Sequence, residues 1–354
     1  MQKRVAILEI GGSHDECILS QLIGLKAANC WIVFCGTREM LKKNSQFKHY
    51  IDAFHEVKLP RSTFGDFFEM VRLNKWFSAN AIDIVIANTA QGGHIRNLCL
   101  TARPKVKFFG IIHTIKMLNG SFTQSLISRK INQYFVLNDT LKKRVKEKPG
   151  IQIHSFYPLS YPHFDQRQEK GPGEFRVAII GGVENRRKDL DGFLAMAQTT
   201  PKHVQFYFLG KSNPGSDEVK VFEQRLEELQ LTDRVQLFHE FVSEESFDAC
   251  LQQTDAIFPL VHPGTPSADE YFSRQISGAI NIAFSYKIPM MIHEHYQDWE
   301  DFQSGVAFYN LTNFPGQFST FLSDHQELKQ QLVSNPKFSS EIQNQQFARV
   351  VLQG

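Results

Sequence analysis

The feature that most constrains the fold is an alternation, repeated along the whole chain, of short apolar runs with segments of helical periodicity. Most of the apolar runs are continuous, as in strands that are covered on both faces. This pattern is typical of parallel α/β sheets. In the first half we predict strands at 5–10, 31–35, 82–87, 108–113 and 133–137, and a helix at 16–28.

A break at 161–174 separates this half from a second alternation. The segment combines two prolines, two glycines and several charges with few apolar residues, which is typical of a linker. Beyond it we predict strands at 175–180, 204–209, 234–238, 256–260 and 289–292, helices at 189–197, 217–229 and 273–284, and a helical tail from Phe318.

Both halves begin with a strand that runs into a glycine pair, Ile10-Gly11-Gly12 and Ile180-Gly181-Gly182. The simplest architecture is an α/β fold of two Rossmann-like domains facing each other across a cleft. The length of 354 residues suits two domains. We place the N-terminal domain at 1–163 and the C-terminal domain at 174–330. Residues 331–354 form a C-terminal helix that could pack back on the N-terminal domain.

Charge and cysteine content exclude several classes of protein. A net charge of +2 leaves no single-sign excess to neutralise nucleic-acid phosphates. The five cysteines are odd in number and form no Cys-x-x-Cys pair, which argues against a disulfide framework or a zinc site. No apolar stretch approaches the ~20 residues that span a bilayer. The N-terminus runs directly into a strand without a signal-peptide pattern, so we predict a cytoplasmic protein.

A local basic cluster lies in the segment 142–148. It consists of Lys142, Lys143, Arg144, Lys146 and Lys148. One interpretation is a solvated helix end. The other is weak, peripheral adhesion to the anionic surface of the inner membrane.

The strongest local motif follows the strand at 175–180. Gly181 and Gly182 would let the backbone approach a ligand closely. Three cations, Arg186, Arg187 and Lys188, then precede a helix with Asp189 as its N-cap. Cations beside a helix start suit a diphosphate, although a surface turn with ordinary charges is the alternative. The motif lacks the glycine spacing of dinucleotide-binding and Walker loops, which disfavours a nicotinamide dehydrogenase or an ATPase.

Two further segments lie at the same predicted sheet edge. Lys211 ends the strand after 204–209, where open α/β sheets bind ligands. The loop after 256–260 carries chemistry-bearing side chains and then small residues at a helix start, where backbone amides can face a phosphate. The residues of this loop are His262, Glu270, Tyr271, Arg274, Ser277 and Gly278. Taken singly, a turn histidine, a loop carboxylate and an exposed lysine are equally ordinary structural features.

In the first half, the segment Gly11-Gly12-Ser13-His14-Asp15-Glu16 places a histidine beside two carboxylates. Such a group can act as a general base or bind acceptor hydroxyls, while capping of the next helix explains it equally well. His94 and His113 also follow predicted strands. The sequence has no nucleophile-elbow triad and no His-Glu-x-x-His metal pattern, so we expect no metal site.

The segments 179–190, 206–211, 234–260 and 271–292 resemble those of GT-B glycosyltransferases, particularly the family 4-like bacterial sugar transferases. The resemblance implies that the C-terminal domain binds a nucleoside diphosphate sugar and that Arg187 or Arg186, with Lys188 and Lys211, binds the diphosphate. That family carries two glutamates eight residues apart on its donor-site helix. Here Arg274 and Ile282 occupy those places, and neither is acidic. The resemblance therefore leaves open the sugar and ribose contacts and whether the outcome is retaining or inverting. Glu270 could substitute for one carboxylate.

The resemblance therefore implies a metal-independent hexosyltransferase without a cofactor. It would move sugar from a nucleoside diphosphate sugar to a glycan or lipid-linked acceptor, in bacterial surface polysaccharide synthesis. Alternatives are a nucleotide-sugar epimerase of the same fold and a catalytically inactive nucleotide-sugar-binding protein. The expected catalytic residues are Arg187, Lys188 and His14. The expected donor-binding residues are Gly181, Gly182, Arg186, Lys211, His262, Glu270, Tyr271, Arg274, Ser277 and Gly278. The expected acceptor-side residues are Gly12, Asp15, His94 and His113.

Overall fold

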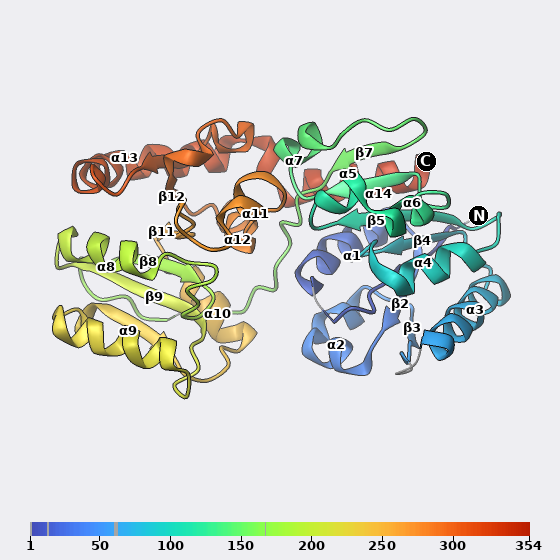
Figure 1. Cartoon of the computed structure of the whole chain (residues 1–354), viewed down its shortest axis with the longest axis horizontal. Helices are drawn as coiled ribbons and strands as arrows, with labels where there is room; N and C mark the ends of the chain where they lie inside the picture. The colour runs from blue at the N-terminus through green and yellow to red at the C-terminus, as the bar shows by residue number, and fades with distance from the viewer. Residues whose placement is uncertain (1, 13, 60–62, 167) are drawn as a thin grey trace. The chain divides into compact units, whose positions relative to one another are not determined.

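A computed structural model describes residues 2–12, 14–59, 63–166 and 168–354. It divides into two compact units (Figure 1). Unit 1 comprises Met1–Tyr161 and Ser339–Gly354, and unit 2 comprises Pro162–Phe338. The chain leaves unit 1 once and returns to it once. The boundary that we placed at 330 falls inside a continuous helix, α13 (Phe314–Ser334), which belongs to unit 2.

Unit 1 is built on a parallel sheet of seven strands in the order β3-β2-β1-β4-β5-β6-β7. The strands are β1 (Arg4–Leu8), β2 (Trp31–Gly36), β3 (Ala53–Glu56), β4 (Ile84–Ala87), β5 (Lys107–Ile112), β6 (Gln133–Val136) and β7 (Gln152–Ser155). The five predicted strands are confirmed. The sequence did not indicate β3 and β7, because these edge strands carry polar residues and are only partly covered.

The described helices of unit 1 are α1 (Ile18–Ala27), α2 (Arg38–Lys43), α3 (Thr63–Ala79), α4 (Gly92–Thr101), α5 (Lys116–Gly120), α6 (Phe122–Ile127), α7 (Asp139–Arg144) and α14 (Ser340–Gln353). Although α14 ends the chain, it packs directly on α1. A Cβ on Gly24 would lie 2.4 Å from the carbonyl oxygen of Asn344. The ring of Phe347 lies 4.7 Å from that of Phe135 and 4.6 Å from that of Phe156.

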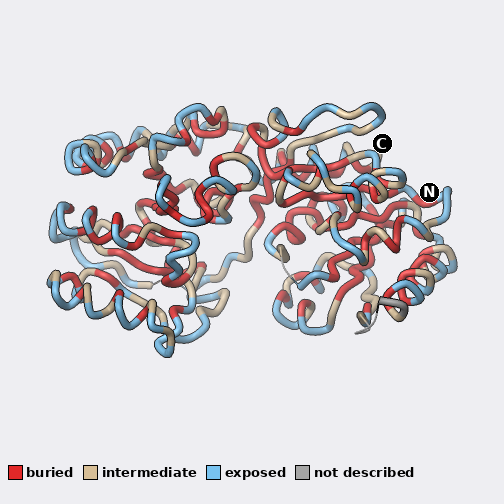
Figure 2. The backbone as a smooth tube through the Cα atoms, viewed as in Figure 1, coloured by how far each residue is buried: buried red, intermediate tan, exposed pale blue. Residues whose placement is uncertain are grey.

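Unit 2 repeats the design with a parallel six-stranded sheet in the order β10-β9-β8-β11-β12-β13. Its strands are β8 (Phe175–Ile180), β9 (Val204–Lys211), β10 (Val235–Phe238), β11 (Ala256–Ile257), β12 (Met290–His293) and β13 (Val306–Tyr309). The five predicted strands are again confirmed, and β13 is a further edge strand. The strands run through the buried interior of each unit, while the outer faces of the helices are exposed (Figure 2).

The described helices of unit 2 are α8 (Leu190–Thr199), α9 (Asp217–Glu228), α10 (Glu244–Leu251), α11 (Ala268–Ser273), α12 (Gly278–Tyr286) and α13. The predicted helix at 273–284 is wrong at its start, because Ser273 ends α11 and Ser277 caps α12. The Ser277 hydroxyl accepts a hydrogen bond from the Ala279 N–H at 3.4 Å. In the described part of the chain, every helix is too short or too polar to cross a lipid bilayer.

Candidate functional site

The first candidate site lies in unit 2 where the strand order reverses. β8 pairs with β9 on one side and with β11 on the other, and open α/β sheets bind ligands at the carboxyl ends of such strands. A cavity of about 200 Å³ lies there. We call it the donor cavity, after the donor site predicted from the sequence. It is lined by Ile180, Gly181, Glu184, Arg187, Lys188, Pro259, Val261, Tyr271, Ser277, Gly278 and Ala279.

The glycines of this edge let two loops touch backbone to backbone. Gly181 has a φ of +90°, which side-chain-bearing residues rarely adopt. A Cβ on Gly182 would lie 2.1 Å from the carbonyl oxygen of Lys211, and one on Gly210 would lie 2.6 Å from the Gly181 backbone. Lys211 therefore supports the site through its main chain. Its side chain is exposed and is not part of the cavity lining.

Lys188 places a buried ammonium group in the donor cavity. The residue is 6% exposed, and its Nζ donates a hydrogen bond to the Gly182 carbonyl at 3.0 Å. The pKa of Lys188 is lowered to about 8, mainly by burial; the neighbouring Arg187 adds to this effect, and Glu184 opposes it. Arg187 is half-exposed, with its Nε 3.3 Å from Glu184 Oε2. The cavity thus combines one buried and one accessible cation.

The start of α12 forms another wall of the cavity. The first N–H groups of a helix lack intrahelical partners and attract anions. A Cβ on Gly278 would meet no atom within 4 Å, so the space beside this helix start is open. Tyr271, which belongs to α11, also lines the cavity, and burial raises the pKa of its hydroxyl. The cavity therefore offers two cations and a helix start to an anionic ligand.

The donor cavity brings together some of the predicted donor residues and leaves others outside. Those in its lining are Gly181, Arg187, Lys188, Tyr271, Ser277 and Gly278. Gly182 lies directly behind it as the hydrogen-bond acceptor of Lys188. Arg186, Glu270 and Arg274 are exposed and outside the lining. The Arg186 carbonyl instead accepts hydrogen bonds from the N–H and hydroxyl of Ser267.

His262 is buried and does not line the cavity. It is 1% exposed; its Nδ1 lies 2.7 Å from Asp189 Oδ2 and its Nε2 lies 2.6 Å from the Tyr309 hydroxyl. Asp189 also caps α8 through the Gly192 N–H. The histidine therefore joins α8 to the edge strand β13, which is a structural position.

Several cavity residues escaped the sequence analysis. Glu184 stands within the predicted motif but carries the wrong charge for a phosphate ligand, and its partner is Arg187. The apolar walls Ile180, Pro259 and Val261 look like ordinary strand ends. Leu260 between the last two has a φ of 56°, a strained conformation for a branched residue that sequence does not reveal.

The second candidate site lies at the equivalent reversal in unit 1, where β1 pairs with β2 and β4. Glu9 follows β1 and is 1% exposed. Its carboxylate accepts hydrogen bonds from the Gly11 N–H at 2.6 Å, the Thr89 hydroxyl at 2.6 Å and the Asn88 amide at 2.8 Å. Burial nevertheless raises the pKa of Glu9. Asn88 also donates to the His14 carbonyl at 2.9 Å, so Glu9 and Asn88 together hold the loop that carries His14.

His14 and His113 meet at this site. Their rings stack with centroids 3.6 Å apart and an interplanar angle of 7°. His14 Nδ1 lies 3.4 Å from Glu16 Oε1. His113, which follows β5, donates from Nε2 to the Asn88 carbonyl at 2.7 Å, and burial lowers its pKa to about 4. The site therefore contains one neutral buried imidazole and one accessible imidazole beside a carboxylate.

The other predicted residues of unit 1, Gly12, Asp15 and His94, take no part in the stacking of His14 on His113. The Asp15 carboxylate is 2.8 Å from Lys43 Nζ and from the Asn44 amide, so it ties the loop to α2. His94 on α4 is hydrogen-bonded to Asp66 of α3. Gly12 is exposed with a φ of +71°, which suits the turn before His14. Of the acceptor-side residues, only His113 therefore contacts the predicted catalytic residue His14. Asp15 and His94 have structural partners, and Gly12 is exposed.

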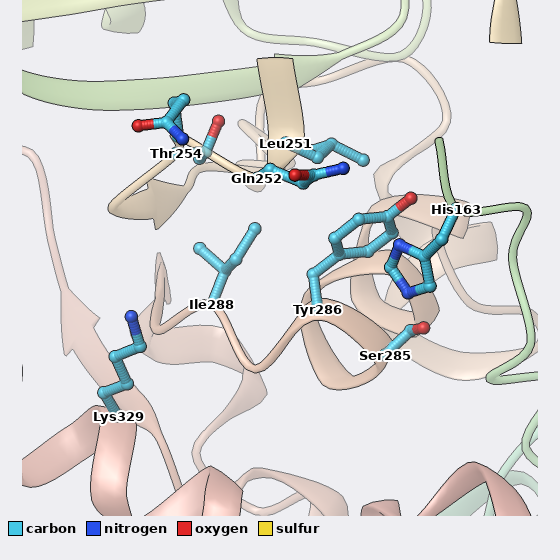
Figure 3. Close-up of a pocket in the computed structure, with 9 residues that line it drawn as sticks. His163, Leu251, Gln252, Thr254, Ser285, Tyr286, Ile288 and Lys329 are labelled. Carbon is cyan, nitrogen blue, oxygen red and sulfur yellow. The ribbon is translucent and has the colours of Figure 1, made fainter. Parts of the chain in front are cut away.

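A larger cavity of about 410 Å³ lies elsewhere in unit 2 (Figure 3). Figure 3 shows Tyr286 beside His163, consistent with their ring distance of 5.3 Å. Both side chains hydrogen-bond to the buried Asp248 carboxylate, at 2.7 and 3.1 Å. Lys329 contributes the ammonium group of the lining. These contacts fasten the segment after 161 to α10 and α12.

The described residues include no group of three His, Cys, Asp or Glu side chains placed to hold a metal ion.

No protein-family model matches the chain, and no curated protein sequence is significantly similar to it. Solved structures are similar over nearly the full length. A glycosyltransferase from Rickettsia africae aligns with a TM-score of 0.69 at 11% identity, covering 99% of this chain and 98% of that one. Anabaena HepE in complex with UDP-glucose aligns with a TM-score of 0.68 at 14% identity, covering 99% and 100%. A putative UDP-N-acetylglucosamine 2-epimerase from Listeria monocytogenes aligns with a TM-score of 0.63 at 11% identity, covering 99% and 95%.

These similarities concern the fold. Two α/β units with parallel sheets of seven and six strands match the glycosyltransferase structures along both chains. The prediction of a GT-B fold with two Rossmann-like domains is therefore confirmed. At 11–14% identity the likeness carries no residue roles.

Proposed function

We propose that the protein is a glycosyltransferase that takes its sugar from a nucleoside diphosphate sugar bound in unit 2. The observation that carries the proposal is the donor cavity, where Lys188, Arg187 and the start of α12 surround the Gly181 backbone. An ammonium, a guanidinium and helix-start N–H groups are the groups that bind a diphosphate. The bound UDP-glucose of the similar HepE structure supports a uridine donor as the first one to test.

Chemically, these groups would stabilise the departing nucleoside diphosphate. Negative charge grows on the diphosphate as the bond to the sugar breaks, and fixed cations and N–H groups lower the energy of that state. Because two protein cations already line the cavity, we propose hexosyl transfer that needs neither a metal ion nor a cofactor. Unchanged turnover in the presence of EDTA is the expected result.

Isothermal calorimetry tests the donor assignment. We expect UDP or another nucleoside diphosphate to bind the wild-type protein, and Lys188→Met to weaken that binding at least tenfold. Arg187→Ala should lower turnover by about 10²-fold, the usual effect of removing one transition-state donor. Lys202→Ala is the matched control, because this exposed lysine lies at the opposite, amino end of β9. Absence of binding to every nucleoside diphosphate and its sugar esters would overturn the proposal.

For the acceptor we propose a glycan or lipid-linked hydroxyl, in bacterial surface polysaccharide synthesis, with the protein in the cytoplasm at the inner membrane. The basic cluster supports the membrane contact. Lys142 and Lys143 lie on α7, and the Lys146 N–H donates to the Asn119 side chain at 3.0 Å. Phe122 begins α6 shortly after Asn119 and is 79% exposed. Co-sedimentation with phosphatidylglycerol vesicles but not phosphatidylcholine vesicles, lost in Phe122→Asp, tests it.

A nucleotide-sugar epimerase is the second candidate, favoured by the similarity to the Listeria structure. Incubation with UDP-N-acetylglucosamine alone separates the two, because an epimerase changes the donor without any acceptor. NMR of the nucleotide-sugar after incubation gives the answer. Donor binding without transfer, hydrolysis or epimerisation would instead indicate a catalytically inactive binding protein.

A further inference from the structure

Arg187 and Lys188, the two cations of the donor cavity, belong to a segment that a second loop of unit 2 holds at both ends. That loop covers residues 260–267, between β11 and α11, and we call it the clamp loop. Its residue Val261 lines the donor cavity. The clamp loop therefore borders the cavity and also contacts the segment that carries the cations.

One end of this segment is held through the carbonyl of Arg186. This carbonyl accepts a hydrogen bond from the Ser267 N–H at 3.2 Å and another from the Ser267 hydroxyl at 2.6 Å. It belongs to the same planar peptide unit as the Arg187 N–H, which donates to the Glu184 carbonyl at 3.1 Å. Both polar groups of this peptide unit are thus bonded, which fixes the backbone from which the Arg187 side chain extends.

The other end is held through Asp189, which follows Lys188. Its N–H donates a hydrogen bond to the Leu260 carbonyl at 2.9 Å, and its carboxylate accepts one from Nδ1 of His262 at 2.7 Å. The bond to His262 is the main reason why the pKa of Asp189 is lowered, so the carboxylate is ionised and can only accept hydrogen bonds. The proton therefore lies on Nδ1 of His262, and Nε2 accepts a hydrogen bond from the Tyr309 hydroxyl at 2.6 Å.

The clamp loop has a fixed shape of its own. The His262 N–H donates to the Thr265 hydroxyl at 3.1 Å, and the Thr265 N–H donates to the His262 carbonyl at 2.9 Å. Leu260 is 1% exposed and has a φ of 56°, in the left-handed region that a branched residue rarely adopts. Such a conformation persists only where the surroundings enforce it. Here it accompanies the hydrogen bond from Asp189 to the Leu260 carbonyl.

We propose that the clamp loop sets the position of Arg187 and Lys188, so that Ser267 and His262 are positioning residues for the diphosphate of the donor. This inference rests on the proposed function, because it concerns the ligand of the donor cavity. Binding is weakened when a loop must first be ordered around the ligand. Because the peptide units on both sides of the cation pair are already held, the diphosphate meets both charges in place.

Calorimetry on Ser267 variants tests the first contact. The probe is whichever of UDP, GDP, ADP and dTDP binds the wild-type protein most tightly. Ser267→Ala should weaken its binding about two- to tenfold, the range expected for one hydrogen bond, and Ser267→Thr, which keeps a hydroxyl, should restore it. Ser243→Ala is the matched control, since it removes a capping hydrogen bond from α10 and Ser243 does not line the cavity. Wild-type affinity in Ser267→Ala, or an equal loss in Ser243→Ala, would overturn the proposal.

Two substitutions of His262 test the second contact. The amide nitrogen of His262→Asn can still donate to Asp189, whereas His262→Leu leaves that carboxylate without its donor. We expect about tenfold weaker binding of the same probe in His262→Leu and near wild-type binding in His262→Asn. Tyr309→Phe keeps the bond to Asp189 and should also bind like the wild type. Equal affinities in the Asn and Leu variants, both shown to be folded by circular dichroism, would contradict a positioning role for His262.

A double-mutant cycle tests whether Ser267 acts through the cation. In a protein that already carries Arg187→Ala, the further change Ser267→Ala should cost little additional affinity, because the side chain that Ser267 positions is gone. Residues that act through one another show such non-additive losses. Fully additive losses would mean that Ser267 affects binding by another route, and the proposal would fail.

Amide hydrogen exchange of the ligand-free protein separates this inference from the proposed function. Ser267→Ala and His262→Leu should speed exchange in the segment 186–189, where the Asp189 N–H is bonded to the clamp loop, and Ser243→Ala should not. Unchanged exchange in the first two variants would overturn the positioning role, whatever the protein binds. Faster exchange in a protein whose wild type binds no nucleoside diphosphate would instead overturn the proposed function.

Discussion

Among single residues, Lys188 is the buried cation of the donor cavity. Its ammonium group is enclosed, contacts the Gly182 carbonyl and has a neighbouring guanidinium, and its pKa is lowered to about 8. The group is charged at pH 7 and largely neutral at pH 9. A bound diphosphate favours the charged form, so binding must take up a proton where the free protein has lost one.

We therefore expect the affinity for UDP to fall as pH rises from 7 to 9. The fall approaches about tenfold per pH unit above the pKa, because each unit leaves a tenth as much ammonium form. Calorimetry at several pH values measures it. Lys188→Met should bind weakly and independently of pH over this range, whereas Lys202→Ala should follow the wild type. A wild-type affinity that does not change between pH 7 and 9 would contradict the prediction.

The sequence indicates which residues lie together only where they belong to one loop. Gly181, Arg187 and Lys188 all line the donor cavity because they follow one strand, β8. His262 could not be placed in this way. Its burial depends on the hydroxyl of Tyr309, 47 residues further along the chain. Likewise, nothing in the run around Glu9 shows that Asn88 and Thr89 will hold its carboxylate.

For the elements, the contacts of His262 determine how α8, the loop after β11 and β13 are held together. Asp189 and Tyr309 each bind one ring nitrogen of the buried histidine. The edge strand β13 was missed although its four residues, Val-Ala-Phe-Tyr, are apolar. The edge strands β3 and β7 were missed because they carry polar residues, whereas the central strands, covered on both faces, were all predicted.

Tyr309→Phe should lower the free energy of unfolding of unit 2 by about 1–3 kcal/mol, since it leaves a buried ring nitrogen without a partner. The ring itself is retained, so packing is preserved. Thermal unfolding followed by circular dichroism should show a transition lowered by several degrees. Tyr50→Phe, a half-buried residue of unit 1, should leave that transition in place. An unchanged Tyr309→Phe transition would mean that the hydrogen bond between His262 and Tyr309 adds nothing to the free energy of unfolding.

At the scale of the whole molecule, the two units differ in how many segments of the chain build them. Unit 2 is one continuous segment, while unit 1 is completed by α14 from the far end of the chain. The α14 side chain Phe347 lies against the rings of Phe135 and Phe156, and Gly24 of α1 gives the helix backbone room to approach. Removing a large buried aromatic side chain such as this one typically lowers the free energy of unfolding by several kcal/mol.

A chain that ends at residue 338 should therefore keep a folded unit 2 and lose most of the stability of unit 1. Calorimetric unfolding should show the unit 1 transition strongly lowered or absent, while UDP still binds the intact donor cavity. A chain that ends at Leu352 is the control, because it keeps Phe347 and Val351 in place. Equal stability of the two chains would show that α14 is dispensable.

The late arrival of α14 also sets an order during synthesis. All of unit 2 leaves the ribosome before the last piece of unit 1 exists, and domains fold as units while the chain is being made. At that stage the nascent chain contains all of unit 2, while the surface of α1 that α14 will cover is still exposed to solvent. A polypeptide released too early by a premature stop would keep that apolar surface exposed, and chaperones and proteases could distinguish it from a finished copy.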